Sequence, residues 1–414
     1  MRRFLLFPLI GFTLAAASLP KAPKPEDLGL SSERLQRIHQ MMQRHIDAGE
    51  VTGVVTLVAR HGQIAWVDAQ GVQDLDTKAP MKRDSLFRMA SMTKPVIGTA
   101  MMMMLEEGKI LVTDRVSKFI PEFKNMKVAV LQTPGSGRGP NATPPKYYTV
   151  PADRELTIKE LLTHTSGLVA GPMGQAAMAP MRRKPEDTLD TFIPRVAETP
   201  LEFQPGTRWM YSASDGFDPL GLIIQRASGE PLNVFLKQRI FDPLDMPDTS
   251  HYPTDAQMPR LVSVYQQRDG KLVKSSLEAS LSMSSKIYFA SGGGLVSTID
   301  DYSHFAQMLA NGGEFNGHRL LSPTTVKYMA SVHIPDTLPG RSPGEGFGLS
   351  VRVVQDANVG EIRIPDGSFG WSGVYGTHFW VDPKDDIVAV MMSQTSVGPM
   401  RNEFENLVMS AIMK

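Results

Sequence analysis

The chain has 414 residues, 42% of them hydrophobic and 21% charged, and its 43 basic residues are balanced by 43 acidic ones. This composition is that of a globular protein with a large core, and the balanced charge gives no reason to expect nucleic acid as a partner. The absence of cysteine excludes disulfide bonds, thiol nucleophiles and cysteine metal sites. The nine histidines are not grouped at ligand spacings, so we expect neither a metal nor a cofactor. The 25 methionines fit the role of core fillers.

The N-terminus has the regions of a secretory signal peptide in their usual order. Two arginines precede an apolar stretch, and three alanines before Ser18 offer a small-residue cleavage site. We therefore expect a signal peptide over residues 1–17, a linker over residues 18–27, and export to the periplasm or the medium. The alternative is a cytoplasmic protein with an apolar N-terminal arm. No later run is long and apolar enough to cross a bilayer, so we expect no stable membrane span once the signal is removed.

After the linker, the pattern predicts a helix and then a hairpin. Ser31 or Ser32 can cap a helix whose apolar positions recur at helical spacing, and Gly49 follows its end. Residues 51–59 and 63–70 are rich in strand-forming types and are separated by a three-residue turn signal.

The next segment carries the first candidate catalytic residues. Ser91 and Lys94 are three residues apart in the predicted first turn of a buried helix, so their side chains share one face. A serine hydroxyl becomes a nucleophile when a nearby base takes its proton, and a lysine can act as that base only where burial or a helix N-terminus favours its neutral form. A second Ser-x-x-Lys, from Ser18 to Lys21, lies in the N-terminal segment, so the spacing alone does not establish a catalytic role.

The rest of the chain is predicted to return to strands after a helical middle. Residues 156–248 have mostly helical patterns, and residues 170–180, rich in Met, Ala, Pro and Gly, have the composition of a lid. The remaining predicted segments are a loop at 133–145, a helix capped at Ser297 or Thr298 after three glycines, strands at 347–354, 377–381 and 387–392, and a C-terminal helix at 404–412.

Together these elements predict an α+β fold. Strands near both ends of the chain pair in one antiparallel sheet covered by the first and last helices, and an all-helical region is inserted between them. The corresponding domains are an α/β domain made of residues 28–90 and 286–414 and a mostly helical domain of residues 91–285.

Five motifs follow one another within residues 28–414. They are Ser91-Met92-Thr93-Lys94, Leu161-Leu162-Thr163-His164-Thr165-Ser166-Gly167-Leu168, Pro205-Gly206 leading into Tyr211-Ser212-Ala213, Gly292-Gly293-Gly294-Leu295, and Gly370-Trp371-Ser372-Gly373-Val374-Tyr375-Gly376. With these motifs the chain resembles the serine β-lactamase and penicillin-binding-protein superfamily. Within that superfamily it is similar to the class C β-lactamase-like esterases, or family VIII carboxylesterases. The resemblance implies a β-lactamase-like fold and a small-molecule substrate.

The resemblance also assigns roles to individual residues. It implies that Ser91 is the nucleophile that is acylated, and that Lys94 and Tyr211 act as one coupled proton-transfer unit, without deciding which of the two takes the proton. It implies an oxyanion hole made by the backbone N–H groups of Ser91 and of Val374, the latter on an edge strand.

Two positions depart from the β-lactamase pattern, and both concern substrate binding. Where class C lactamases and peptidases carry Lys or His in the third motif, this chain has Trp371, followed by Ser372 and Gly373, and the asparagine of the second motif is Ala213. A carboxylate beside Trp371 would lose its hydration without gaining a cationic partner. We therefore expect a carboxylesterase with a Trp371 pocket wall that cleaves neutral short- to medium-chain acyl esters, with at most weak β-lactam hydrolysis.

Several alternatives stay open. A class C-like β-lactamase or D,D-peptidase, an acyltransferase and a non-catalytic penicillin-binding sensor fit the same scaffold, and the oligomeric state is not indicated. His164 could serve as a triad base, but we expect it to fix a helix end through local hydrogen bonds. Residues 340–344 match the Gly-x-Ser-x-Gly of a nucleophile elbow, but no strand pattern precedes them, which predicts an ordinary loop.

Overall fold

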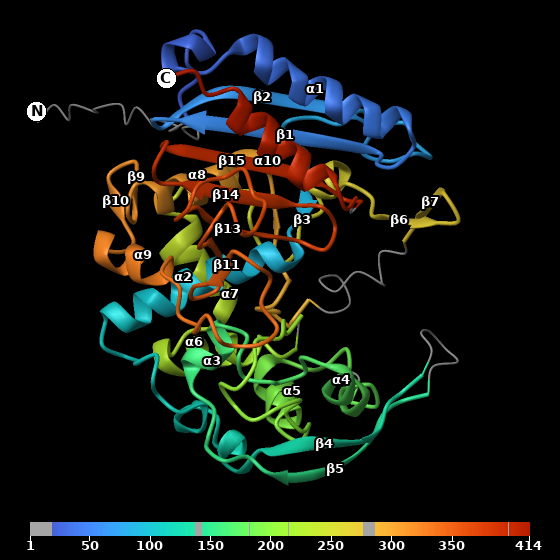
Figure 1. The fold of residues 1–414 in the computed structure, drawn as a ribbon, viewed down its shortest axis with the longest axis vertical. Coiled ribbons are helices and arrows are strands. Elements are labelled where there is room, and N and C mark those ends of the chain that lie inside the picture. The colour runs from blue at the N-terminus through green and yellow to red at the C-terminus, as the bar shows by residue number, and fades with distance from the viewer. Residues whose placement is uncertain (1–18, 137–142, 182, 214, 276–285, 396) are drawn as a thin grey trace, which may run out of the picture.

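The structure is a computed structural model that describes residues 19–136, 143–181, 183–213, 215–275, 286–395 and 397–414. The predicted signal peptide lies outside the described residues. Within them, no helix is both long and apolar enough to cross a bilayer. The predicted α+β fold is confirmed, because one antiparallel sheet carries helices on both faces and a mainly helical region lies beneath it in Figure 1.

The central sheet joins strands from both ends of the chain. Its order is β11-β12-β13-β14-β15-β1-β2, and every neighbouring pair is antiparallel. The strands are β1 (Gly53–Arg60), β2 (Gln63–Gly71), β11 (Glu345–Phe347), β12 (Arg352–Val354), β13 (Phe369–Ser372), β14 (His378–Asp382) and β15 (Ile387–Ser393). In the β1–β2 turn, His61 and Gly62 both have positive φ, as the favoured two-residue hairpin turn requires, so the predicted hairpin is confirmed.

Helices cover both faces of the sheet because its strands bury both faces. Alternate residues of β1 pack into two separate cores, one on each side. The helices α1 (Ser32–Asp47) and α10 (Met400–Ser410) lie on one face, and α8 (Ile299–Ala310) lies on the other. The predicted caps are present, since the Ser31 hydroxyl accepts from the first turn of α1 at 3.2 Å and the Thr298 hydroxyl accepts from the first turn of α8 at 3.3 Å.

The helix α2 (Thr93–Glu106) runs through the middle of the molecule. Its residues from Thr93 to Met104 are all buried, which is typical of a helix inside a core. Four consecutive methionines, residues 101–104, help to fill this core, as predicted. A Cβ built on Gly98 would lie 2.7 Å from the Cβ of Ser350, so only glycine allows this close approach.

The region between the sheet-forming segments is less helical than predicted. Its helices after α2 are α3 (Ile158–Leu162), α4 (Pro172–Met178), α5 (Leu189–Val196), α6 (Pro219–Ser228) and α7 (Leu232–Leu236). It also contains two hairpins, β4 (Lys127–Thr133) with β5 (Lys146–Pro151), and β6 (Tyr265–Arg268) with β7 (Lys271–Lys274). We did not predict them because these strands are largely exposed and lack a buried alternating pattern. The two-domain division stays a prediction.

The strand predicted at residues 347–354 is in fact two strands. β11 ends at Phe347 and β12 begins at Arg352, and between them Ser350 has φ 75°, the left-handed conformation of a tight reversal. The run is mostly apolar, so its hydrophobic pattern did not reveal the reversal. The smaller elements are β3 (Phe87–Arg88), β8 (Val296–Ser297), β9 (Glu314–Phe315), β10 (His318–Arg319) and α9 (Pro323–Met329).

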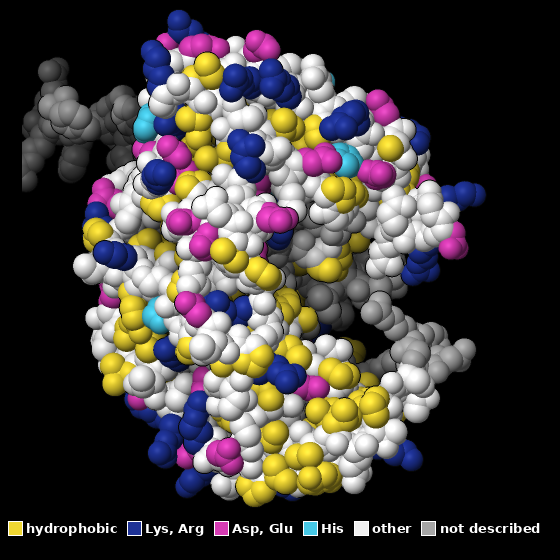
Figure 2. Space-filling model, viewed as in Figure 1, with side chains coloured by type: hydrophobic (Ala, Val, Ile, Leu, Met, Phe, Trp, Pro, Cys, Tyr) yellow, Lys and Arg dark blue, Asp and Glu magenta, His cyan; other side chains and the backbone are white. Residues whose placement is uncertain are grey.

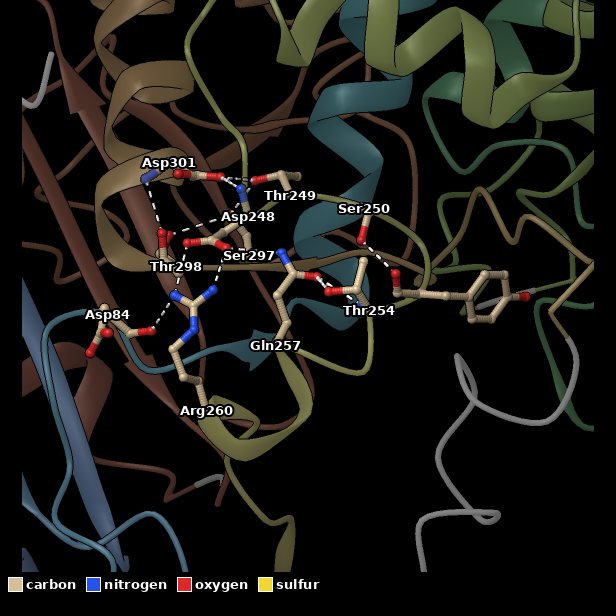
Figure 3. A network of polar contacts seen from close by, with 11 residues as sticks. Asp84, Asp248, Thr249, Ser250, Thr254, Gln257, Arg260, Ser297, Thr298 and Asp301 are labelled. Atoms are coloured by element: carbon tan, nitrogen blue, oxygen red, sulfur yellow. Dashed lines mark hydrogen bonds and ion pairs between the residues drawn. The ribbon is translucent and has the colours of Figure 1, made fainter. Parts of the chain in front are cut away.

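A polar network joins the segment at Asp248 and Thr249 to β8 and to the first turn of α8 (Figure 3). The carboxylate of Asp301, in the first turn of α8, accepts from the Asp248 N–H and the Thr249 hydroxyl, both at 2.8 Å. Asp248 in turn forms an ion pair with Arg260. Burial raises the pKa of Asp301 to about 7. The network holds β8, and β8 pairs with β3, which ends three residues before Ser91.

The surface carries both signs of charge. Figure 2 shows Lys and Arg side chains interspersed with Asp and Glu over the face in view. Because the two signs are mixed, this face presents no continuous field of one sign. Apolar side chains are also exposed: on the β4–β5 hairpin, Leu131 and Tyr148 are about half exposed, at 48% and 49%.

Candidate active site

Ser91 lies in a short 3₁₀ turn, Ala90–Met92, that leads directly into α2. We predicted it in the first turn of the α-helix itself, and the difference is a tighter winding of that turn. Ala90 has φ 46°, a left-handed conformation that costs a non-glycine residue about 1–3 kcal/mol and that clusters at functional sites. The turn is therefore held in place by its surroundings.

Backbone bonds to two other segments anchor this turn. The Met89 N–H donates to the Leu295 carbonyl at 2.8 Å, and the Leu295 N–H donates to the Thr93 hydroxyl at 3.1 Å. The Tyr302 hydroxyl, from α8, donates to the Met92 carbonyl at 2.7 Å. The glycine-rich segment before β8 and the helix α8 thus fix the Ser91 turn on both sides.

The Ser91 hydroxyl is the meeting point of two titratable side chains. The Tyr211 hydroxyl donates to Ser91 Oγ at 2.6 Å, and Lys94 Nζ donates to it at 3.3 Å. Ser91 and Tyr211 are partly exposed, whereas Lys94 is fully buried. The three side chains that the sequence predicted to act together are in contact.

Two backbone carbonyls complete the surroundings of Lys94. Its Nζ donates to the Gly292 carbonyl at 2.6 Å and to the Ala213 carbonyl. The ring centroid of Tyr211 lies 5.0 Å from Nζ, within the range of a cation–π interaction. With Ser91 as the third acceptor, all three ammonium protons have partners, so the amine is fixed in direction as well as in place.

His164 positions the segment that carries Tyr211. The carbonyl of His164 accepts from the Met210 N–H at 3.0 Å, and its Nδ1 accepts from the Ser212 N–H at 3.2 Å. Burial lowers the pKa of His164 well below 6.5, and the charge of Lys94 lowers it further, so the ring is neutral. The predicted local bond at the helix end is present, from the His164 N–H to the Leu161 carbonyl at 3.5 Å, but His164 also bonds to the chain on either side of Tyr211, which we did not predict.

The third motif lies on β13 and on the turn after it. Trp371 packs on Tyr211 with ring centroids 5.4 Å apart and meets Phe347 edge-on at 5.2 Å. The edge-strand position predicted for Val374 is wrong. Val374 lies in the β13–β14 turn, where it is 62% exposed, and β13 has a neighbouring strand on each side.

This turn is fastened beside Ser91. A Cβ on Gly373 would lie 2.4 Å from the Met89 carbonyl oxygen and 2.2 Å from Thr377 Oγ1, so glycine is required there. The Thr377 hydroxyl donates to the Met89 carbonyl at 3.1 Å. Within the part of the chain that the structure describes, the N–H of Val374 has no protein acceptor. A backbone donor is thus available next to the Ser91 turn.

The side chain of Ser372 faces away from Ser91. Its Oγ lies 2.8 Å from His378 Nδ1, and His378 Nε2 lies 3.0 Å from a carboxylate oxygen of Glu405 on α10. Neighbouring residues of a strand point to opposite faces, so Ser372 and Trp371 belong to different sides of the sheet. The structure therefore does not bring this side chain to the predicted substrate site.

A cavity of about 520 Å³ opens beside the Ser91 turn. Ala213 and Gly293 border it, and α4, within the predicted lid segment, supplies part of its wall. The other lining residues are Val169, Gln175, Met178, Ala179, Met181, Arg183, Phe192, Asp215, Asp218 and Ala290. Trp371, predicted as a pocket wall, lines a separate, smaller cavity with Trp209 and Phe347.

One buried charge in this site was not predicted from the sequence. Asp218 is 1% exposed, and its carboxylate accepts from the Tyr288 hydroxyl and from the Gly292 N–H, both at 2.7 Å. Burial raises the pKa of Asp218. Its signal was two aspartates, 215 and 218, closely following Tyr211. Across the described residues, no three His, Asp or Glu side chains are placed to hold a metal ion.

Comparisons with known proteins place this geometry in a family. The chain is 35% identical over 364 residues to the uncharacterized protein MT1414 of Mycobacterium tuberculosis, covering 84% of this chain and 87% of the relative. It is 28% identical over 407 residues to Esterase EstB of Burkholderia gladioli, covering 92% and 95%. It is also 25% identical over 437 residues to a putative D-alanyl-D-alanine carboxypeptidase of Escherichia coli K12, covering 98% and 94%.

Solved structures of similar fold include enzymes of the same kind as these relatives. EstCE1, described as a hydrolase with promiscuous acyltransferase activity, superimposes with a TM-score of 0.75 at 26% identity, covering 92% of this chain and 99% of that one. The simvastatin synthase LovD of Aspergillus terreus has a TM-score of 0.75 at 20% identity, which shows a shared fold. A family model described as Beta-lactamase matches residues 38–412. The chain therefore belongs to the beta-lactamase family and is a serine hydrolase of the superfamily that unites β-lactamases, penicillin-binding proteins and related esterases.

Proposed function

We propose that this protein is a carboxylesterase that cleaves neutral short- to medium-chain acyl esters through an acyl-enzyme on Ser91. One observation carries the proposal: Ser91 Oγ accepts hydrogen bonds from both Tyr211 and Lys94, at 2.6 Å and 3.3 Å, beside an open cavity. A serine with two such partners has a short route for its proton, which is what activation of the hydroxyl requires.

Acylation begins when the ester carbonyl carbon comes within reach of Ser91 Oγ. In the reactive form the Lys94–Tyr211 unit has lost one proton to solvent, so the serine hydroxyl proton passes to it while Oγ bonds to carbon and the carbonyl electrons move onto oxygen. The backbone N–H groups of Ser91 and Val374 hold that oxyanion. Collapse of the intermediate breaks the bond to the alkoxy oxygen, which takes the proton from the same unit and leaves as the alcohol.

Deacylation repeats these steps with water in place of serine. Water gives one proton to the Lys94–Tyr211 unit, its oxygen bonds to the acyl carbon, and the bond to Ser91 Oγ breaks. The proton returns to Oγ, so the serine is restored and the carboxylic acid is released.

The charges around the site favour a neutral substrate. Lys94 already has three acceptors, and Trp371 stands where a lactamase has a cationic residue. A substrate carboxylate beside Trp371 would therefore be desolvated without gaining a cationic partner at residue 371 or at Lys94. The similarity to an esterase at 28% identity supports the same choice, while the carboxypeptidase relatives keep peptide and lactam hydrolysis as the alternative.

Acyl transfer is a second candidate for the same acyl-enzyme. EstCE1, at 26% identity, is described as a hydrolase with promiscuous acyltransferase activity. An alcohol in the cavity would take the place of water in the second half-reaction. Transfer to an added alcohol that outruns hydrolysis would support this candidate.

The test is a paired assay with intact protein. We expect p-nitrophenyl butyrate to be cleaved with a kcat/KM at least about 100-fold above that for a chromogenic cephalosporin, with a transient acyl mass on Ser91. The second substrate pair, p-nitrophenyl octanoate and a D-Ala-D-Ala peptide, separates esterase from peptidase. Faster turnover of the cephalosporin or the peptide than of either ester would overturn the proposal.

A further inference from the structure

A buried carboxylate stands behind the catalytic lysine without touching the serine. Asp218 is the residue that precedes α6, and its two oxygens accept from the Tyr288 hydroxyl and the Gly292 N–H, each at 2.7 Å. The carbonyl of the same glycine accepts from Lys94 Nζ at 2.6 Å. A chain of hydrogen bonds thus leads from Asp218 through one residue to Lys94.

The packing of α6 explains why this chain of bonds is short. A Cβ on Gly221, one turn into α6, would lie 1.9 Å from the hydroxyl oxygen of Ser291. The helix can therefore approach the Gly292 segment only because residue 221 has no side chain. This contact places Asp218 against Gly292.

Both oxygens of Asp218 accept hydrogen bonds from donors, which is the pattern of an ionised carboxylate. Its negative charge lies close enough to Lys94 to attract the ammonium, whose field in turn favours the ionised carboxylate. Two hydrogen bonds and the positive charges of Arg183 and Lys94 together favour the ionised form of this fully buried aspartate.

Resting on the proposed function, we propose that Asp218 is a positioning residue for the Ser91 reaction. It holds the Gly292 carbonyl against Lys94, and it places a negative charge behind the amine that lies beside Ser91. Asp218 does not touch substrate atoms in this role.

The other charged and titratable groups around Asp218 define the controls. They are Lys94 on α2, Asp215 and Arg183 at the cavity, Tyr288 in the glycine-rich segment and Tyr252 in the segment after α7. Burial and the charge of Asp218 together raise the pKa of Asp215 to about 6, so Asp215 also titrates within the pH range of the assay. A pH experiment therefore has to separate removal of the Asp218 charge from loss of its hydrogen bonds.

Asp218→Asn removes the charge and keeps the shape, and Tyr288→Phe is the matched variant that removes one hydrogen bond and keeps the charge. For Asp218→Asn we expect kcat on p-nitrophenyl butyrate to fall about 10- to 100-fold with KM within about threefold. We expect the acid limb of the kcat/KM profile to move to lower pH by about one unit, because the variant lacks the buried negative charge that disfavours loss of a proton from the site. For Tyr288→Phe we expect the acid limb to stay within about 0.3 unit.

A second readout makes the inference independent of the ester substrate. A fluorophosphonate labels an activated serine whether or not it turns over esters, so its labelling rate at Ser91, followed by intact mass across pH, should show the same one-unit shift. Wild-type labelling without ester turnover would count against the proposed function and leave the Asp218 test intact. Asp218→Ser serves as the second charge-removing variant if Asp218→Asn does not fold. An unmoved acid limb in the charge-removing variant, or an equal shift in Tyr288→Phe, overturns the inference.

Discussion

Two serines of this chain contact basic side chains, yet they lie on opposite sides of the sheet. Ser91 contacts Lys94 and Tyr211 beside a cavity. Ser372 contacts His378, which lies 3.0 Å from Glu405, so this group has the residue types of a serine–histidine–carboxylate triad. Residue type and contact therefore do not separate the two groups, and the difference must lie in their surroundings.

The group formed by Ser372, His378 and Glu405, on the side of the sheet that carries α10, is buried and its charges are already paired. His378 and Glu405 are 2% and 3% exposed, and the Arg352 guanidinium lies 3.1 Å from the same Glu405 carboxylate. Burial lowers the pKa of His378 and so keeps it neutral. A carboxylate already paired with arginine gives little support to a developing imidazolium. The comparison teaches that burial and a carboxylate already paired with arginine, and not the residue types, distinguish the Ser372 group from the Ser91 group.

The largest effect should come from removing the Ser91 hydroxyl. We expect Ser91→Ala to lower kcat/KM on p-nitrophenyl butyrate by about 10⁴-fold or more, because no acyl-enzyme can form. The matched variant is Ser372→Ala, which removes the other hydroxyl and should change the rate by less than about threefold. If Ser372→Ala were the inactive variant, the two groups would have been assigned the wrong way round.

The Ser91 group could be predicted because its chemistry lies in short segments. Ser91 and Lys94 lie one turn apart, and the resemblance to a known order of motifs, with Tyr211 after a Pro-Gly turn, placed all three in one site. The face of Ser372 and the turn position of Val374 depend on where β13 ends and on which strands flank it. Those are long-range pairings that a local pattern does not encode.

Prediction of the fold from local sequence patterns has the same limit. The amphipathic helix α1 and the hairpin β1–β2 were predictable because one repeats its apolar positions and the other has turn residues that allow positive φ. The reversal at Ser350 was not, because the chain on both sides of it is buried. Asp218 was missed because a buried charge is indistinguishable in sequence from a surface one until its partners are known.

The next largest effect should come from the Tyr211 hydroxyl. Tyr211→Phe keeps the ring that packs on Trp371 and removes the donor 2.6 Å from Ser91 Oγ. We expect kcat to fall about 10²- to 10³-fold while the melting temperature stays within a few degrees, since general acid–base groups contribute on this scale. The control is Tyr147→Phe on the β4–β5 hairpin, which should leave the rate unchanged. A loss below about threefold in Tyr211→Phe would leave Lys94 as the sole proton carrier.

The group formed by Ser372, His378 and Glu405 should affect the free energy of unfolding and not the rate of ester cleavage. Burial alone would raise the pKa of Glu405, but its contact with His378 and the charge of Arg352 outweigh burial and lower the pKa to about 2. A carboxyl whose folded pKa is depressed adds stability above its unfolded pKa of about 4.5, and this stability is lost as pH falls toward 2.

We therefore expect Glu405→Gln to lower the free energy of unfolding by about 3 kcal/mol at pH 7, as measured by urea denaturation. The difference between the variant and the wild type should narrow steadily between pH 5 and pH 3. The ester kcat of the folded variant should stay within about threefold of the wild type. A variant as stable as the wild type at pH 7 would show that this group adds nothing to the fold.

The smallest effect should come from Trp371, the neighbour of Ser372 that points to the Ser91 side. Trp371→Lys restores a cation where the chain departs from the lactamase pattern. We expect the ratio of cephalosporin to ester kcat/KM to rise about tenfold, because a substrate carboxylate gains a partner worth about 1.4 kcal/mol and the ester gains none. Trp371→Phe, which keeps an aromatic ring against Tyr211, should leave the ratio within about twofold. If both variants changed the ratio equally, the packing of the ring on Tyr211, and not the missing charge, would set the preference for esters. The preference of the Ser91 site for esters would then depend on the position of Tyr211 alone.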